Sequence, residues 1–256
     1  MNPKNKLEIL ARPLAMDPRF LASFFSYSDD ADEKWWTLKT ELQGAVAIVH
    51  ARGVVGSFWF GFAAEDLAKA VEEAAAKARA VVLDLNSPGG VVDGVPEAAA
   101  RIAAVGVPVV AHTAGMMCSA AYWLAAGANA ITASTAAEVG SIGVYCPMVD
   151  YSAMCEKEGI KVELAKTGAL KGAGFFGTPW TDEQKAHMQQ MVDDIFEDFR
   201  GDVLKHRAGI PDEAMTGGAY MAKRAEGLGL VDAVGSLEEA VRLAERLGIA
   251  KQTAHQ

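Results

Sequence analysis

The sequence predicts an α/β fold with a mainly parallel sheet, built from repeated strand and helix units and preceded by an N-terminal arm. Short runs of β-branched and aliphatic residues alternate with longer stretches in which apolar residues recur at helical spacing. Strands separated by helical stretches of this length join in right-handed parallel units. A chain of 256 residues, 51% of them hydrophobic, is long enough to bury such a sheet in one domain.

Each expected element follows from a local pattern. Residues 80–85 (AVVLDL) are mostly apolar, as in a buried strand, and the strand ends where residues 86–90 (NSPGG) bring proline and two glycines. Residues 114–128 are small and apolar apart from Ser119, and they predict a buried helix over 118–126. Thr181 precedes two acidic residues and caps an amphipathic helix that runs to about Arg207. The other expected elements are strand 45–49, helix 63–78, helix 95–105, strand 107–111, strand 130–133 and strand 162–165.

The pattern divides the chain into three parts. Residues 1–43 mix prolines, three phenylalanines and an acidic run, which is typical of an arm that packs on a neighbour or on the body. Residues 44–249 carry the alternating pattern and form the main domain, and residues 250–256 form a tail. The aromatic residues form one group of interest, which consists of Phe20, Phe24, Phe25, Trp35, Trp36 and the run 58–60. We expect this group to be partly buried between subunits, to line a groove, or to pack within one monomer.

Composition excludes several classes of function. The net charge of −9 argues against non-specific nucleic-acid binding, which needs clustered Lys and Arg. The three cysteines, Cys118, Cys146 and Cys155, form no CxxC pair and predict neither a disulfide framework nor a zinc site. The first residues lack the apolar core of a secretory signal, and residues 114–128 are shorter than the ~20 that span a bilayer. We therefore expect a cytoplasmic protein without a membrane anchor.

Ser119 and Lys171 are the candidate nucleophile and base. A serine hydroxyl needs a base, and no histidine lies between these two residues. A lysine can serve when burial keeps its amine neutral, and Lys171 lies among small and apolar residues. Taken alone, a serine in an apolar helix is also compatible with packing, and most lysines are solvated. We expect Cys118 to be a small buried hydrophobe and His112 to make a structural hydrogen bond.

Gly89 and Gly90 follow a parallel strand at its carboxyl end, where open α/β folds bind ligands. Their backbone amides can bind a developing oxyanion, although a Pro-Gly-Gly sequence is also an ordinary turn.

Several motifs in order resemble the signal peptide peptidase A family of serine-lysine proteases, whose fold is the ClpP/crotonase fold. The resemblance runs from about residue 45 to 249 and is carried by residues 115–123 (GMMCSAAYW), 140–144 (GSIGV), 150–152 (DYS), 159–162 (GIKV), 167–171 (TGALK) and 225–232 (AEGLGLVD). It is strongest to the phage capsid-maturation protease branch, which also has a segment like 12–18 (RPLAMDP) near its N-terminus.

The resemblance implies a role for each matching residue. Ser119 matches the nucleophile and Lys171 the general base, Ser141 helps to hold the lysine amine, and Gly89 and Gly90 form the oxyanion turn. Neither metal nor nucleotide is implied. In relatives the serine and the lysine can come from adjacent copies, which implies a closed homo-oligomer. The chain departs from the family where Leu170 precedes the lysine in place of the common histidine and apolar residues 172–176 follow it, which affects the shape of the substrate groove.

The implied function is a serine endopeptidase that cleaves scaffold or capsid-assembly protein during phage head maturation. Removal of leftover signal peptides is the alternative within the family, and a catalytically inactive assembly or scaffold protein is the alternative from another class. A Clp-type protease needs a histidine about 25 residues after its serine, which this chain lacks. An enoyl-CoA hydratase needs paired carboxylates, for which Glu138 supplies one candidate while Ser119 stands where the other is expected.

Overall fold

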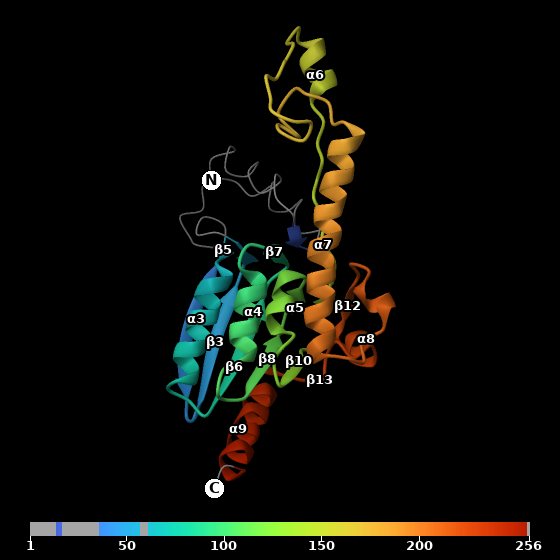
Figure 1. Cartoon of the computed structure of the whole chain (residues 1–256). Coiled ribbons are helices and arrows are strands. Elements are labelled where there is room, and N and C mark those ends of the chain that lie inside the picture. Colours follow the sequence, from blue (N-terminus) through green and yellow to red (C-terminus); the bar gives the residue numbers. More distant parts are fainter. Residues whose placement is uncertain (1–13, 17–35, 57–60, 255–256) are drawn as a thin grey trace.

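The computed structural model describes residues 14–16, 36–56 and 61–254. Figure 1 shows its elements, which in chain order are β1 (Leu14–Met16), β2 (Thr37–Gln43), β3 (Val46–Arg52), β4 (Val54–Val55), β5 (Gly61–Phe62), α3 (Ala64–Ala75), β6 (Ala80–Asn86), β7 (Gly89–Val91), α4 (Val95–Ala103), β8 (Val109–Thr113), β9 (Met116–Cys118), α5 (Ala120–Ala125), β10 (Ala130–Ala133), β11 (Glu138–Gly140), α6 (Ser152–Lys157), α7 (Asp182–His206), the 3-10 helix η1 (Asp212–Met215), β12 (Ala219–Met221), α8 (Ala222–Gly227), β13 (Ala233–Val234) and α9 (Leu237–Thr253).

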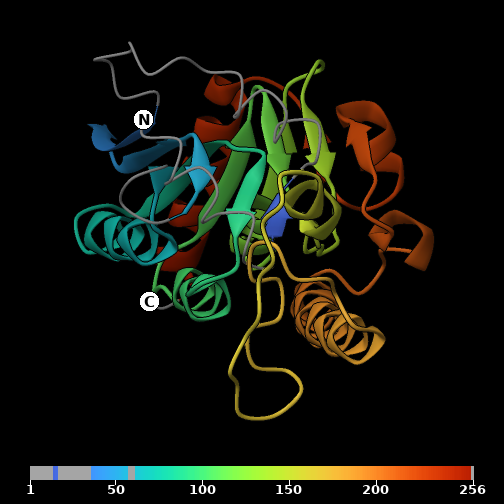
Figure 2. The ribbon, with the colours of Figure 1, turned by 90° about the horizontal axis from the view of Figure 1, so that it is seen from above.

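The centre of the fold is a six-stranded sheet in the order β13-β10-β8-β6-β3-β2. Its strands run parallel except for β2, which pairs antiparallel with β3. Helices α3, α4 and α5 cover one face and α9 covers the other (Figure 2), because successive strand residues point to opposite faces and both sets are apolar. The predicted α/β class with a mainly parallel sheet is confirmed.

The sheet also reaches into the segment predicted as the N-terminal arm, since β2 pairs with β3 along its whole length. The division into arm, main domain and tail stays a prediction. Residues 1–13 and 17–35 and the aromatic run 58–60 lie outside the described residues, and so do Phe20, Phe24, Phe25 and Trp35. Trp36 is described, and it packs partly buried against the main core.

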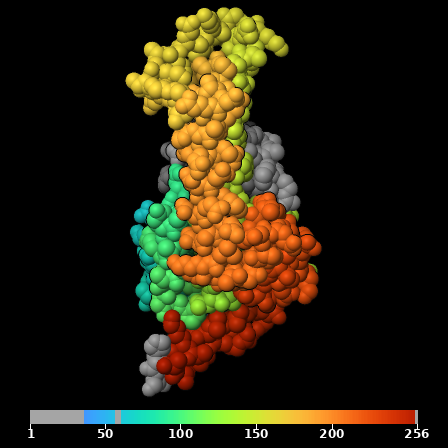
Figure 3. Space-filling view, turned by 45° about the vertical axis from the view of Figure 1, so that its right-hand side comes forward, coloured from blue at the N-terminus to red at the C-terminus, as the bar shows by residue number. Residues whose placement is uncertain are grey.

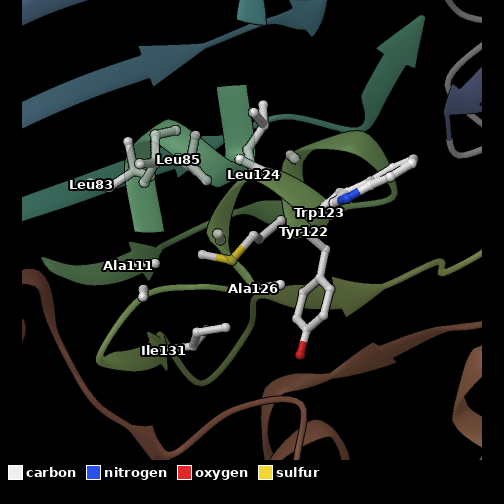
Figure 4. Close-up of a cluster of buried hydrophobic side chains, with 14 of the residues drawn as sticks. Leu83, Leu85, Ala111, Tyr122, Trp123, Leu124, Ala126 and Ile131 are labelled. Atoms are coloured by element: carbon white, nitrogen blue, oxygen red, sulfur yellow. The ribbon is translucent and has the colours of Figure 1, made fainter. Parts of the chain in front are cut away.

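Helix α5 is buried on all sides and joins the sheet to α7. Figure 4 shows Leu83 and Leu85 of β6 close to Leu124 of this helix, with Tyr122 and Trp123 beside it. The ring of Trp123 stacks on Phe199 of α7 at 4.5 Å between centroids, and its Nε1 donates to Asp202 at 2.9 Å. These contacts fix the C-terminal part of α7 against α5.

Several predicted elements have other bounds in the structure, and two of the differences bear on the candidate site. The helix expected over 118–126 begins at Ala120, because residues 116–118 form β9 and leave Ser119 between a strand and a helix. The strand expected over 162–165 was wrong: these residues have no regular structure, since they lie beyond the sheet with no neighbouring strand to pair with. At Thr181 the prediction is confirmed, because its side chain accepts from the backbone N–H of Gln184 and caps α7.

A projection stands away from the sheet (Figures 1 and 3). It consists of residues 145–190, which include α6, the loop before α7 and the first turns of α7. Trp180 ties the start of α7 to the segment before α6, since its Nε1 donates to the carbonyl of Val149 and its backbone N–H donates to Asp150 Oδ2. None of the helices in the described part of the chain combines the length and apolar character needed to cross a bilayer.

Candidate active site

Ser119 occupies a strained turn between β9 and α5. Its backbone has φ 57° and ψ −121°, a conformation that disfavours any residue with a Cβ. Among the described residues, the other non-glycine position with positive φ is Ser141, at 52°. Such a conformation costs of order 1–3 kcal/mol and persists only where the surroundings enforce it. Strained strand-to-helix turns of this kind present the nucleophile in α/β-hydrolases. Both strained residues were singled out from the sequence.

Hydrogen bonds hold the two serine segments together. The backbone N–H of Ser119 donates to the carbonyl of Gly140 at 2.7 Å, and its Oγ donates to the carbonyl of Gly143 at 3.4 Å. On the other side, the N–H of Ser141 donates to the carbonyl of Gly218 at 2.7 Å. Ser119 is completely buried and Ser141 nearly so. The structure therefore brings Ser141 beside the candidate nucleophile.

The predicted oxyanion turn lies directly against β9, the strand that ends just before Ser119. The N–H of Ser87 donates to the carbonyl of Met116 at 2.8 Å, and the N–H of Cys118 donates to the carbonyl of Ser87 at 3.1 Å. Gly89 follows with a left-handed φ of 92°, and its N–H donates to Ser87 Oγ at 3.1 Å. The turn and the nucleophile are thus fixed by two short strand-like bonds.

At Gly90 the structure gives a different reason for glycine than close approach to a ligand. A Cβ built there would lie 1.6 Å from the carbonyl oxygen of Val55, because β7 and β4 pair at this position. The glycine therefore permits close contact between two strands, and its suggested part in binding an oxyanion stays a prediction.

Asn86 is a residue of the site to which the sequence analysis gave no role. Its Oδ1 accepts from the N–H of Met116 at 3.1 Å, and a Cβ on Gly115 would lie 2.5 Å from the same atom. The side chain thereby ties the end of β6 to the start of β9. The sequence offered one signal for Asn86: it is a polar residue at the end of an apolar strand, directly before the predicted turn.

Lys171 lies on the projection and is exposed within one chain. Its segment is anchored by Gln184, whose Nε2 donates to the carbonyl of Ala169 at 3.0 Å. Gln184 is in the first turn of α7, and Figure 1 shows this end of α7, with the loop before it, at the end of the projection that lies away from α5 and the sheet. Lys171 is therefore held away from Ser119 of its own chain.

The neighbouring lysines have partners within the projection. Lys161 forms an ion pair with Glu163 at 2.6 Å, and Lys166 donates to the carbonyl of Ala169 at 3.1 Å. No such partner is found for Lys171 among the described residues. Its amine is thus available to a group outside this chain.

The remaining titratable candidates are structural. His112 is buried, and its Nδ1 forms a hydrogen bond with Thr132 Oγ1 at 2.9 Å, as predicted. Burial lowers the pKa of His112, with the nearby charge of Asp84 opposing the shift. Cys118 is fully buried in β9, also as predicted. The described residues contain no cluster of three or more His, Cys, Asp or Glu arranged to hold a metal ion.

Comparisons with known proteins agree with this fold. The model of peptidase family S49 matches residues 101–251. An Enterococcus faecium protein carrying the name signal peptide peptidase SppA is 31% identical over 184 residues, which cover 68% of this chain and 52% of the relative. Capsid assembly protease C of Escherichia phage lambda is 34% identical over 115 residues, covering 44% of this chain and 26% of the relative.

A solved structure of the 1510-N membrane-bound stomatin-specific protease has a TM-score of 0.51 at 15% identity and covers 79% of this chain and 85% of that one. This likeness concerns the fold alone.

The chain therefore belongs to peptidase family S49, a family of serine peptidases, and has the crotonase/ClpP-like fold. It spans about half the length of the first curated relatives it matches.

Proposed function

We propose that this chain is a serine endopeptidase in which Ser119 is the nucleophile and Lys171 of a neighbouring copy is the general base. The observation that carries the proposal is the strained turn at Ser119, hydrogen-bonded to the oxyanion turn on one side and to the Ser141 segment on the other. The position of Lys171 on the projection, away from α5 and the sheet, supports a base from another copy.

The reaction follows from these groups. Ser119 Oγ forms a bond to the scissile carbonyl carbon as the carbonyl π electrons move to its oxygen and Lys171 Nζ takes the hydroxyl proton. The Gly89 and Gly90 turn supplies N–H donors to the oxyanion, which requires the Gly89 amide to leave Ser87 Oγ. When the C–N bond breaks, Lys171 returns the proton to the leaving amine, and water then releases the acyl group by the same steps. Ser141 orients the lysine amine.

Surface composition supports the assembly. Of the eleven large hydrophobic side chains exposed among the described residues, seven lie on the projection: Met148, Val149, Met154, Ile160, Leu170, Phe175 and Phe176. Such a concentration is typical of a surface that a partner covers. Because the serine end and the lysine end are different surfaces, the contact is head-to-tail and closes into a ring.

For the substrate, we infer scaffold or capsid-assembly protein, cleaved in the cytoplasm of a bacterial host or in a procapsid. The likeness to the lambda capsid assembly protease supports this choice. Leftover signal peptides are the second candidate, because the relative named signal peptide peptidase matches a larger share of the chain.

Mixing two inactive variants tests the shared site. Ser119→Ala and Lys171→Ala should each abolish peptide cleavage, whereas Lys166→Ala, a neighbouring lysine on the same projection, should retain it. After subunit exchange in an equal mixture, one site in four has both an intact serine and an intact lysine, so about a quarter of wild-type activity should return.

Three outcomes contradict the proposal. No recovery after verified exchange would place each complete site within one chain. Activity near that of wild type in either single variant would exclude Ser119 and Lys171 as the catalytic pair. If a fluorophosphonate fails to label Ser119 and no peptide is cleaved, the chain is an inactive assembly protein.

A further inference from the structure

A groove of about 580 Å³ opens beside the candidate nucleophile. Three segments line it: residues 141–145, one side of α7 and residues 215–217. Gly143, whose carbonyl accepts the hydrogen bond from Ser119 Oγ, is part of its wall. A side chain in the groove would therefore belong to a residue next to the bond that Ser119 attacks.

The wall of the groove is largely apolar, with side chains such as Ile142, Val144, Phe196 and Met215. Among the described residues that line it, one carries a charge at neutral pH, and that residue is Asp193 of α7. Its Oδ1 accepts a hydrogen bond from Gln189 Nε2 at 2.7 Å, which orients the carboxylate. No lysine, arginine or histidine lines the groove to neutralise it.

We propose that this groove binds a lysine or arginine side chain of the peptide substrate, adjacent to the scissile bond, with Asp193 pairing with its cationic end. The inference rests on the proposed endopeptidase function. An apolar wall ending in one carboxylate complements a side chain with a hydrocarbon stem and a charged tip. The same carboxylate disfavours glutamate and aspartate, so it selects by repulsion as well as by attraction.

Two parts of the groove wall have separate tasks. Ser141, which the neighbouring lysine amine would approach to reach Ser119, belongs to the wall formed by residues 141–145, whereas Asp193 belongs to the α7 wall. We therefore expect the substrate side chain to pack against the α7 wall. Asp193 is exposed, and exposed ion pairs contribute 0.2–1 kcal/mol, so the expected preference is modest, about threefold.

The test compares peptides that differ at one position, scanned over two residues on each side of the scissile bond. The residues compared are lysine, its uncharged analogue norleucine, and glutamate. For the wild-type protein, kcat/KM should be about threefold higher with lysine than with norleucine at one position, and lowest with glutamate. The Asp193→Asn variant should cleave the lysine and norleucine peptides equally, and Asp193→Lys should prefer glutamate.

Asp194 provides a matched control on the same helix. Its Oδ1 accepts from Gln190 Nε2 at 2.7 Å, the same arrangement as at Asp193, but it does not line the groove. The Asp194→Asn variant should keep the wild-type order of substrates. Loss of the preference in both variants would mean that the general negative charge of α7 is responsible, and would overturn the assignment to Asp193.

The outcomes also separate this inference from the function on which it rests. Ser119-dependent cleavage with equal rates for lysine and norleucine at every position overturns the groove assignment and leaves the endopeptidase standing. Absence of cleavage together with absence of fluorophosphonate labelling at Ser119 removes both.

Discussion

Replacing Ser119 by glycine and by alanine measures the strain stored at the nucleophile. Both substitutions remove the hydroxyl and its 3.4 Å hydrogen bond to Gly143. Alanine keeps the Cβ, so the backbone at φ 57° and ψ −121° remains strained. Glycine adopts this conformation without a steric cost. The difference in unfolding free energy between the two variants therefore includes the strain, which only the alanine variant retains.

The expected magnitude follows from two opposing contributions. Relief of the strain stabilises the glycine variant by about 1–3 kcal/mol. The greater freedom of glycine in the unfolded chain destabilises it by about 0.5–1 kcal/mol. We therefore expect Ser119→Gly to be more stable than Ser119→Ala by about 1 kcal/mol, or about 3 °C in Tm for a chain of this size.

Urea unfolding of the two variants provides the measurement. The protein concentration must be the same in both experiments, because assembly contributes to apparent stability by mass action. Both variants should be inactive toward peptides, because both lack the Ser119 hydroxyl. A glycine variant less stable than the alanine variant by 1 kcal/mol, as at an ordinary position, would refute the argument that Ser119 is strained.

Two further predictions concern the surroundings of the site. Gly90→Ala should lower the stability of the protein by more than about 2 kcal/mol and reduce peptide cleavage, because its Cβ would meet the Val55 carbonyl. Gly106→Ala is the control: a Cβ there meets nothing within 4 Å, so thermal unfolding and peptide cleavage should change little. Equal effects of the two substitutions would contradict this. Burial lowers the pKa of His112 in the folded state, so protonation favours unfolding and stability should fall as the pH drops from 7 through about 6.5 toward 5.5. In urea unfolding at several pH values, His112→Gln should reduce the loss of stability at low pH, while His187→Gln, at an exposed position on α7, should leave it unchanged. If the unfolding free energy of the His112 variant depends on pH as steeply as that of the wild type, His112 is not the cause.

Local sequence was sufficient for much of the sheet. Strand β10 occupies the predicted residues 130–133, and β6 extends the predicted 80–85 by one residue. In both cases a compact apolar run ends at polar residues or a turn, so the local sequence predicts where the strand ends. The cap at Thr181 is another local signal, since Gln184 completes its hydrogen bonds three residues later.

Residues 162–165 show where the same reasoning failed. Their alternating sequence, VELA, is typical of a strand with one buried face, yet they lie on the projection and pair with nothing in the described chain. A strand requires a partner as well as a pattern, and the partner is decided by the path of the whole chain. The position of Lys171 could not be predicted from the local sequence for the same reason, because the length of α7 determines how far the projection holds this residue from α5.

The conformation of Ser119 has no signal in its own sequence, since serine is not a residue that prefers positive φ. It is imposed by the carbonyl of Gly140, by the start of α5 and by the pairing of β9 with β11. The motif resemblance singled out this residue because a family motif reflects the outcome of such contacts without describing them.

The candidate site has two levels of construction. The oxyanion turn follows β6, Ser119 follows β9 and Ser141 follows β11, so backbone hydrogen bonds between adjacent strands and turns set their relative positions when one chain folds. The proposed base is different, because Lys171 is carried on a projection that holds seven of the eleven large hydrophobic side chains exposed among the described residues. In the proposed site, folding of one chain therefore positions Ser119, Ser141 and the oxyanion turn, and assembly would supply Lys171. Under this proposal a single copy has a prepared nucleophile without a base, which would couple proteolysis to formation of the complete oligomer.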